Sequence, residues 1–148
     1  MRNKIEKTFF NTLLLCAFFA QTNLTMAASL NGALGNASSA TDYYRITCGT
    51  NSFGDTYKLN VALADVAPVA APIISIQVIK GALGKNTYDT NDGDTVYSSA
   101  AIVQGGNGIY QVIIDKTSAG VENYTLKYNC QNSAGATTDT SIVTVQNQ

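Results

Sequence analysis

Apolar side chains recur at every second position along most of this chain, and this alternation is the feature that most restricts the folds it can adopt. It is typical of half-buried β-strands, because successive side chains of a strand point to opposite faces of a sheet. No stretch shows the period of an amphipathic helix. Seven strands are expected, at 44–48, 57–63, 73–79, 97–104, 109–116, 124–130 and 138–146. The sequence therefore predicts an all-β fold in which two sheets form a sandwich.

Two segments interrupt the alternation. Pro68 and Pro72 exclude regular helix from the stretch that contains them, and we expect the chain to cross there from one sheet to the other. The segment 73–79 that follows is rich in β-branched residues and suits a central strand. Residues 81–94 are rich in Gly and Asp and predict a loop.

The dipeptide Asn107-Gly108 lies between two apolar runs and predicts a β-hairpin. Both residues of such a two-residue turn need positive φ, which Asn and Gly tolerate best. The hairpin would place Val103 beside Val112 and Ile102 beside Ile113. The strands on either side of the turn would then be neighbours in one sheet.

The N-terminal segment has the organisation of an export signal. Arg2, Lys4 and Lys7 precede an apolar run, Leu13–Ala20, that is too short to span a membrane. Thr25-Met-Ala27 then supplies small residues for a signal peptidase. Residues 1–27 are therefore predicted to be a cleaved signal peptide, with Ala28 as an alternative last residue.

Three other outcomes of processing remain open. Cleavage could follow Ala20, or Cys16 could carry a lipid, although Leu15 stands where a lipoprotein would have a small residue. The segment could also stay in place as an uncleaved anchor. After cleavage at the predicted position we expect no transmembrane anchor and a periplasmic or extracellular protein.

Removal of 27 of the 148 residues leaves 121, enough for one domain. Six basic and nine acidic residues remain, a net charge of −3 that argues against nucleic acid as a partner. Residues 28–41 are small and polar and predict a flexible leader, or at most one short edge strand. Residues 42–148 are expected to form the β-domain.

Two cysteines remain after cleavage, Cys48 and Cys130. An even number in an exported protein favours a disulfide. Alternation points both side chains inward, so we expect one bond that links the two sheets. The other interpretation is an intermolecular bond between subunits.

Tyr128-Asn-Cys130, followed by Asn132-Ser-Ala-Gly135, resembles the Tyr-x-Cys strand and subsequent turn of bacterial secreted immunoglobulin-like domains. The resemblance implies an immunoglobulin-like two-sheet sandwich, in which such a Tyr anchors a corner and the Cys joins the sheets. The chain has no Trp to pack on that bond. A fold of this kind implies no particular function.

The acidic segment 89–94 is the strongest candidate for a metal site. Asp89, Asn91, Asp92 and Asp94 place side-chain oxygens on one turn, as Ca²⁺ binding requires in an exported protein. Gly93 is the fifth residue of this segment, whereas an EF-hand loop has Gly sixth. A polar turn without metal is therefore the other interpretation.

All eight tyrosines lie after the predicted cleavage point. Alternation assigns most of them to the core, and three remain as surface candidates for binding a sugar or a peptide. The predicted core members are Tyr44, Tyr57, Tyr110, Tyr124 and Tyr128. The predicted surface members are Tyr43, Tyr88 and Tyr97.

The sequence offers little for catalysis. It has no His to act as a base or a metal ligand, and no Gly-x-Ser-x-Gly motif. Carboxylate pairs for glycoside hydrolysis would have to come from strand ends, where solvated turn residues are the ordinary case. The candidates are Asp55, Asp65, Asp115, Glu122, Asp139 and the acidic segment. We expect no enzyme, no catalytic residue and no cofactor other than the Ca²⁺ considered above.

The sequence thus predicts an exported, non-catalytic β-sandwich with a structural or surface-interaction role. A module that binds a small ligand, a carbohydrate or Ca²⁺ is the alternative. A pilin-type subunit, completed by a neighbour's strand, fits less well, because Asn147 stands where that family has a penultimate Tyr. The expected partner is an unidentified protein or cell surface, and a homo-oligomer is left open.

Overall fold

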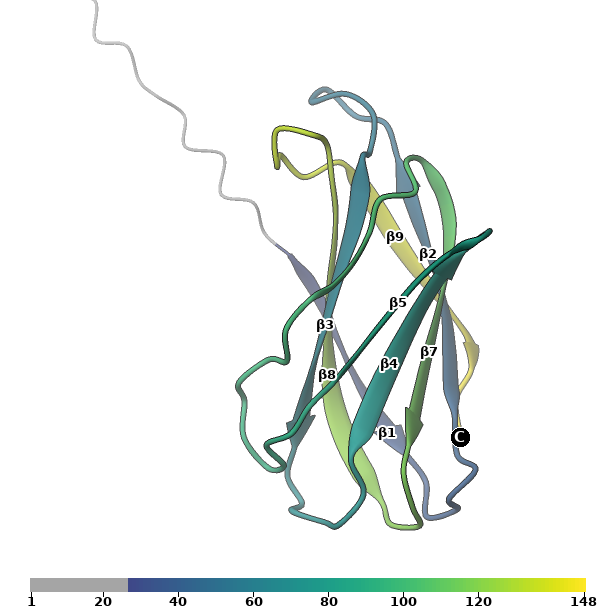
Figure 1. The fold of residues 1–148 in the computed structure, drawn as a ribbon, viewed down its shortest axis with the longest axis vertical. Coiled ribbons are helices and arrows are strands. Elements are labelled where there is room, and N and C mark those ends of the chain that lie inside the picture. Colours follow the sequence, from purple (N-terminus) through teal and green to yellow (C-terminus); the bar gives the residue numbers. More distant parts are fainter. Residues whose placement is uncertain (1–26) are drawn as a thin grey trace, which may run out of the picture.

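A computed structural model describes residues 27–148, which form two antiparallel sheets packed face to face (Figure 1). This part of the chain contains nine strands and confirms the all-β sandwich. The predicted signal peptide lies, except for Ala27, outside the described residues. The strands are β1 (Ala28–Leu34), β2 (Asp42–Gly49), β3 (Lys58–Val66), β4 (Ile74–Lys80), β5 (Leu83–Tyr88), β6 (Ala101–Val103), β7 (Gly108–Lys116), β8 (Glu122–Gln131) and β9 (Asp139–Gln146).

The chain changes sheet at almost every connection. One sheet has the order β1-β8-β3-β6 and the other β5-β4-β7-β2-β9, so only β4 and β5 are joined within a sheet in the described region. The segment with Pro68 and Pro72 joins β3 to β4 across the sandwich, as predicted. The segment 73–79 corresponds to β4, which pairs on both sides, with β5 and β7.

Two strands lie where the sequence shows no alternation. β1 falls in the segment interpreted as a flexible leader or a short edge strand, and it pairs with β8 over seven residues. β5 falls inside the predicted 81–94 loop and pairs with β4. Both are edge strands whose residues are largely exposed, so their pairing depends on backbone hydrogen bonds and leaves little pattern in the side chains.

The predicted hairpin at Asn107-Gly108 is wrong. β6 pairs with β3 in one sheet, whereas β7 pairs with β2 and β4 in the other. The turn instead crosses the sandwich, and the Asn107 side chain fixes it: Oδ1 accepts from the Thr56 amide at 2.8 Å, and Nδ2 donates to Asp55 Oδ1 at 2.9 Å. A local turn motif could not reveal that the two strands belong to different sheets.

Four of the five tyrosines predicted to be in the core are buried, namely Tyr44, Tyr110, Tyr124 and Tyr128. Tyr57 is the exception, with 46% of its surface exposed. It lies just before β3, and its backbone bridges Gln131 and Gly106. The strand alternation does not extend to a residue outside the strand.

The Cys48–Cys130 disulfide joins the two sheets, as predicted. Cys48 lies on β2 of the five-stranded sheet and Cys130 on β8 of the four-stranded sheet, with Cα atoms 5.6 Å apart. Both are buried in the core that the inward rows of both sheets form. Among the described residues, no helix could cross a membrane.

Replacing both cysteines, in Cys48→Ala with Cys130→Ala, should destabilise the fold strongly. The bond closes a separation of 82 residues, and a chain-entropy treatment gives such a crosslink about 4 kcal/mol of stability. The melting temperature should fall by more than about 10 °C. Thermal unfolding followed by circular dichroism measures it, and an unchanged melting temperature would contradict a stabilising role for the bond.

Close packing at Gly32 ties β1 to the core. Gly32 lies opposite Tyr124 in the register of β1 and β8. A Cβ atom at position 32 would lie 2.2 Å from Tyr124 Cζ, a distance that real contacts do not reach. The Tyr124 ring therefore occupies the space that any larger residue at this position would need.

Gly32→Ala should consequently destabilise the protein by about 1–3 kcal/mol, because Tyr124 or β1 has to move. Gly84→Ala on β5 is the matched control, since its Cβ would meet no atom closer than the Val78 carbonyl oxygen at 3.8 Å. Chemical denaturation of both variants provides the comparison. Equal stability of the two would mean that β1 does not pack as described.

Candidate functional site

Strands β3 and β7 end, and β2 and β8 begin, at the lower end of the sandwich in Figure 1. Charged residues stand at this end of their inward rows. On β3 the buried row Leu59, Val61 and Leu63 continues to Asp65, and on β8 the row continues back to Glu122. Asp42 on β2 and Lys116 on β7 occupy the same kind of position. All four side chains are buried.

The segment between β5 and β6 folds over this end and is held by the backbone of Asp65. The Asp65 amide donates to Asp89 Oδ2 at 2.9 Å, and the Asp65 carbonyl accepts from the Gly93 amide at 3.1 Å. Asp92 Oδ2 also accepts from the Ala70 amide. Gly93 has φ of +79°, which suits Gly at this turn. The segment thereby brings Asp92 to the buried ends of β3 and β8.

Asp65, Asp92 and Glu122 together form a carboxylate cluster. One oxygen from each lies within 4.8 Å of the other two. Asp65 is 1% exposed and Glu122 0%. Within the described part of the chain, both Glu122 oxygens, Asp65 Oδ1 and Asp92 Oδ1 have no hydrogen-bond partner. Buried carboxylate oxygens are normally hydrogen-bonded, so this arrangement requires something to neutralise it.

The electrostatics of the cluster reflect burial and mutual repulsion. Burial, with smaller contributions from the charges of Glu122, Asp92 and Asp89, raises the pKa of Asp65 to about 7. Burial also raises the pKa of Glu122. The charge of Asp92 raises this pKa further, and the charge of Lys116 lowers it. Lys116 Nζ itself donates to the carbonyls of Gly35 and Gly120. The cluster can therefore hold protons or bind a cation.

Asp42 belongs to a separate, satisfied network. The Tyr124 hydroxyl donates to Asp42 Oδ2, and the Tyr44 and Tyr124 hydroxyls lie 2.6 Å apart. Asp42 Oδ1 accepts from the Gln148 amide at 2.9 Å. Desolvation raises the pKa of Tyr124 strongly, so its proton is retained. This network closes the core and offers no open ligand position.

Of the three aspartates among the predicted Ca²⁺ ligands, only Asp92 belongs to the cluster. Both Asp89 oxygens accept backbone amides, those of Asp65 and Asn91. Asp94 Oδ1 accepts from the Val96 amide at 2.7 Å. Asn91 takes part through its backbone amide, which donates to Asp89 Oδ1. Three of these residues thus hold the segment in shape.

The sequence offers Asp65 and Glu122 as candidate carboxylates for glycoside hydrolysis, with solvated strand-end residues as the ordinary interpretation, and the structure contradicts the solvated interpretation. Both lie on the buried faces of their strands. The signal was present in the alternation, because 59, 61, 63 and 65 share one face, as do 122, 124, 126, 128 and 130. Their assembly with Asp92 was not visible, because it depends on how the 89–94 segment folds.

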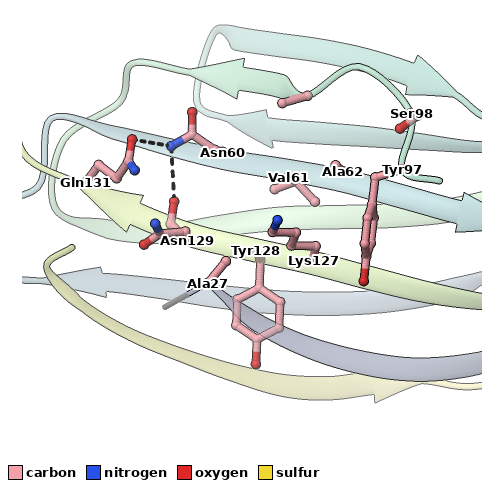
Figure 2. Close-up of a pocket in the computed structure, with 11 residues that line it drawn as sticks. Ala27, Asn60, Val61, Ala62, Tyr97, Ser98, Lys127, Tyr128, Asn129 and Gln131 are labelled. Atoms are coloured by element: carbon pink, nitrogen blue, oxygen red, sulfur yellow. Dashed lines mark hydrogen bonds between the residues drawn. The ribbon is translucent and has the colours of Figure 1, made fainter. Parts of the chain in front are cut away.

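A second feature lies on the outer face of the four-stranded sheet, where a groove of about 460 Å³ crosses β3 and β8 (Figure 2). Asn60 Nδ2 donates to Gln131 Oε1 at 2.8 Å. The Lys127 ammonium lies 5.3 Å from the centre of the Tyr97 ring. Among the described residues, the buried Asn129 Oδ1 has no hydrogen-bond partner. The groove thus combines an aromatic ring, a cation and amides.

Tyr97 was predicted to be a surface residue suited to binding, and it lines this groove. Tyr88 is exposed on β5, and Tyr43 is partly buried on β2. Neither lines the groove. The polar row on β3 and β8 gives no distinct signal in the sequence, because outward polar residues on strands are usually simply solvated.

Comparison of the chain with models of known protein families gave no match, and comparison with curated protein sequences gave none either. The carboxylate cluster and the outer groove are therefore the features from which a function can be inferred.

Metal-free protein should lose stability as the pH rises from 5 to 7.5. The folded state retains the Asp65 proton up to about pH 7, whereas the unfolded chain releases it near its ordinary pKa of 3.8. The folded state thus binds more protons over this range, and the loss should be on the order of 2 kcal/mol. The chain has no His to titrate there.

Thermal unfolding in metal-free buffer at several pH values measures this loss. In Asp65→Asn the slope should become much flatter, because the side chain no longer titrates. A melting temperature that rises with pH in the unmodified protein would contradict the electrostatic assignment.

Proposed function

We propose that this protein is an exported, non-catalytic, immunoglobulin-like β-sandwich that contacts a protein or cell-surface partner through its outer groove. Export is supported by the N-terminal pattern of Arg2, Lys4 and Lys7 before an apolar run. The Cys48–Cys130 bond is also compatible with export, because such bonds persist in oxidising compartments.

The immunoglobulin-like assignment is supported by the position of the disulfide. Cys130 follows Tyr128 by two residues on β8, and its bond reaches across the core to the facing sheet. Tyr128 is buried beside it. Seven of the strands in residues 27–148 correspond to those expected for such a sandwich, and β1 and β5 extend the sheets at their edges.

A non-catalytic role is supported by the positions of the acidic residues. Asp65 and Glu122 belong to the carboxylate cluster described above, and both are buried. A polysaccharide could not reach them as it reaches the open carboxylate pair of a glycoside hydrolase. The chain has no His to activate one of its serines.

Contact with a partner is supported mainly by the polar groove over β3 and β8. Its amides can donate to and accept from an extended polar partner, and Asn129 Oδ1 has an acceptor position free of partners within residues 27–148. Tyr97 offers an aromatic face beside the Lys127 charge. Aromatic rings and polar groups in this combination are typical of contact surfaces.

Site-specific photocrosslinking in cells that produce the protein tests this contact. A photoreactive phenylalanine derivative at Tyr97 should give one defined adduct of higher mass. The same group at Gln111, which is exposed on β7 in the other sheet, should give none. Lys127→Glu should weaken the adduct at position 97, whereas Lys85→Glu on the exposed edge strand β5 should not.

Mass spectrometry then identifies the crosslinked partner. Adducts of equal strength at both positions would show that contact is non-specific. No adduct at position 97, or one that Lys127→Glu leaves unchanged, would mean that the groove is not the contact surface.

A further inference from the structure

We propose that Asp65, Asp92 and Glu122 form a Ca²⁺-binding site at the end of the sandwich that the 89–94 segment covers. Each carboxylate would donate at least one oxygen to the ion. This ligand set differs from the one that the acidic segment suggested by itself, because two of its three members come from β3 and β8. The proposal is independent of the outer groove.

Buried oxygens in the cluster have no hydrogen-bond partner among the described residues. Glu122 is fully buried, and neither of its oxygens accepts a hydrogen bond from the described residues. Asp65 Oδ1, on the adjacent strand β3 of the same sheet, is in the same situation. Asp92, by contrast, has its Oδ2 bonded to the Ala70 amide and its Oδ1 free of partners within residues 27–148. A bound cation would satisfy all three carboxylates at once.

The separation of the carboxylate oxygens also suits Ca²⁺. The three oxygens lie within 4.8 Å of one another, and two oxygens on opposite sides of one Ca²⁺, each about 2.4 Å from it, are about 4.8 Å apart. The more compact Mg²⁺ shell, with bonds of about 2.1 Å, would require two oxygens on opposite sides of the ion to lie only about 4.2 Å apart. An all-oxygen ligand set also favours Ca²⁺ over Zn²⁺, which prefers nitrogen and sulfur.

The charges around the cluster also favour a divalent cation. The Lys116 charge acts on Glu122, but its ammonium is directed to the carbonyls of Gly35 and Gly120. The single charge of Lys116 does not balance three carboxylates, whereas Lys116 and a divalent ion together would. Asp92 is only partly buried, so the ion can enter from its side. Bound there, it would join β3, β8 and the segment between β5 and β6.

Calorimetric titration of the purified, chelator-treated full-length protein with CaCl₂ at pH 7.5 tests the site directly. We expect one Ca²⁺ per chain and a higher melting temperature in millimolar Ca²⁺, since an ion that binds only the folded state stabilises it. MgCl₂ at the same concentration should give a smaller shift. A Mg²⁺ shift equal to or larger than that of Ca²⁺ would overturn the choice of ion.

Two variants separate ligand binding from folding. Asp92→Asn, at the least buried ligand, should weaken Ca²⁺ binding by about tenfold or more. Asp94→Asn is the matched control in the same segment and should bind as the unmodified protein does. Glu122→Gln should lose the Ca²⁺-dependent rise in melting temperature, yet without metal it should melt at or above the unmodified protein, because it removes a buried charge.

Absence of both heat and a thermal shift in millimolar Ca²⁺ would overturn the proposal. Equal losses in Asp92→Asn and Asp94→Asn would do the same, since only Asp92 reaches the cluster. Stabilisation by acid alone, with no response to Ca²⁺, would show that the carboxylates share protons. Lys127→Glu should leave Ca²⁺ binding unchanged, so failure of the groove and failure of this site give different results.

Discussion

Strand β8 is the element on which the other features of this structure depend. It pairs along its length with β1 on one side and β3 on the other. Side-chain alternation divides its residues between two faces. The inner row runs from Glu122 through Tyr124 to Cys130, and thus includes the carboxylate cluster, the Asp42 network and the disulfide. The outer row places Lys127 and Asn129 in the groove.

The two ends of the sandwich are closed by different chemistry. At one end the covalent bond between Cys48 and Cys130 links the sheets. At the other end the inward rows finish in Asp42, Asp65, Lys116 and Glu122, which are buried charges. Burying unpaired charge is unfavourable for folding, and natural proteins keep such groups where they are paired or bind an ion. Asp42 is satisfied by tyrosine hydroxyls and a backbone amide, whereas Asp65 and Glu122 are not.

The connections determine which surfaces become available. Because the chain changes sheet at nearly every connection of the described region, most strands that are consecutive in sequence lie on opposite sides of the core. The same crossings bring Asp92, from the long segment after β5, to the ends of β3 and β8. They also place Tyr97 beside Lys127, thirty residues further along the chain. Both candidate sites thus arise between segments that are distant in sequence.

The sequence by itself determined the all-β class, the burial of Cys48 and Cys130 and the crossing at Pro68 and Pro72, because alternation and proline act locally. The same alternation also assigns Asp65 and Glu122 to the inward faces of their strands. Only the tertiary structure decided that β6 and β7 belong to different sheets, that β1 and β5 are strands, and that Asp92 joins Asp65 and Glu122. Strand partners and loop paths depend on backbone hydrogen bonds between distant segments; every residue can accept such a bond, and every residue but proline can donate one.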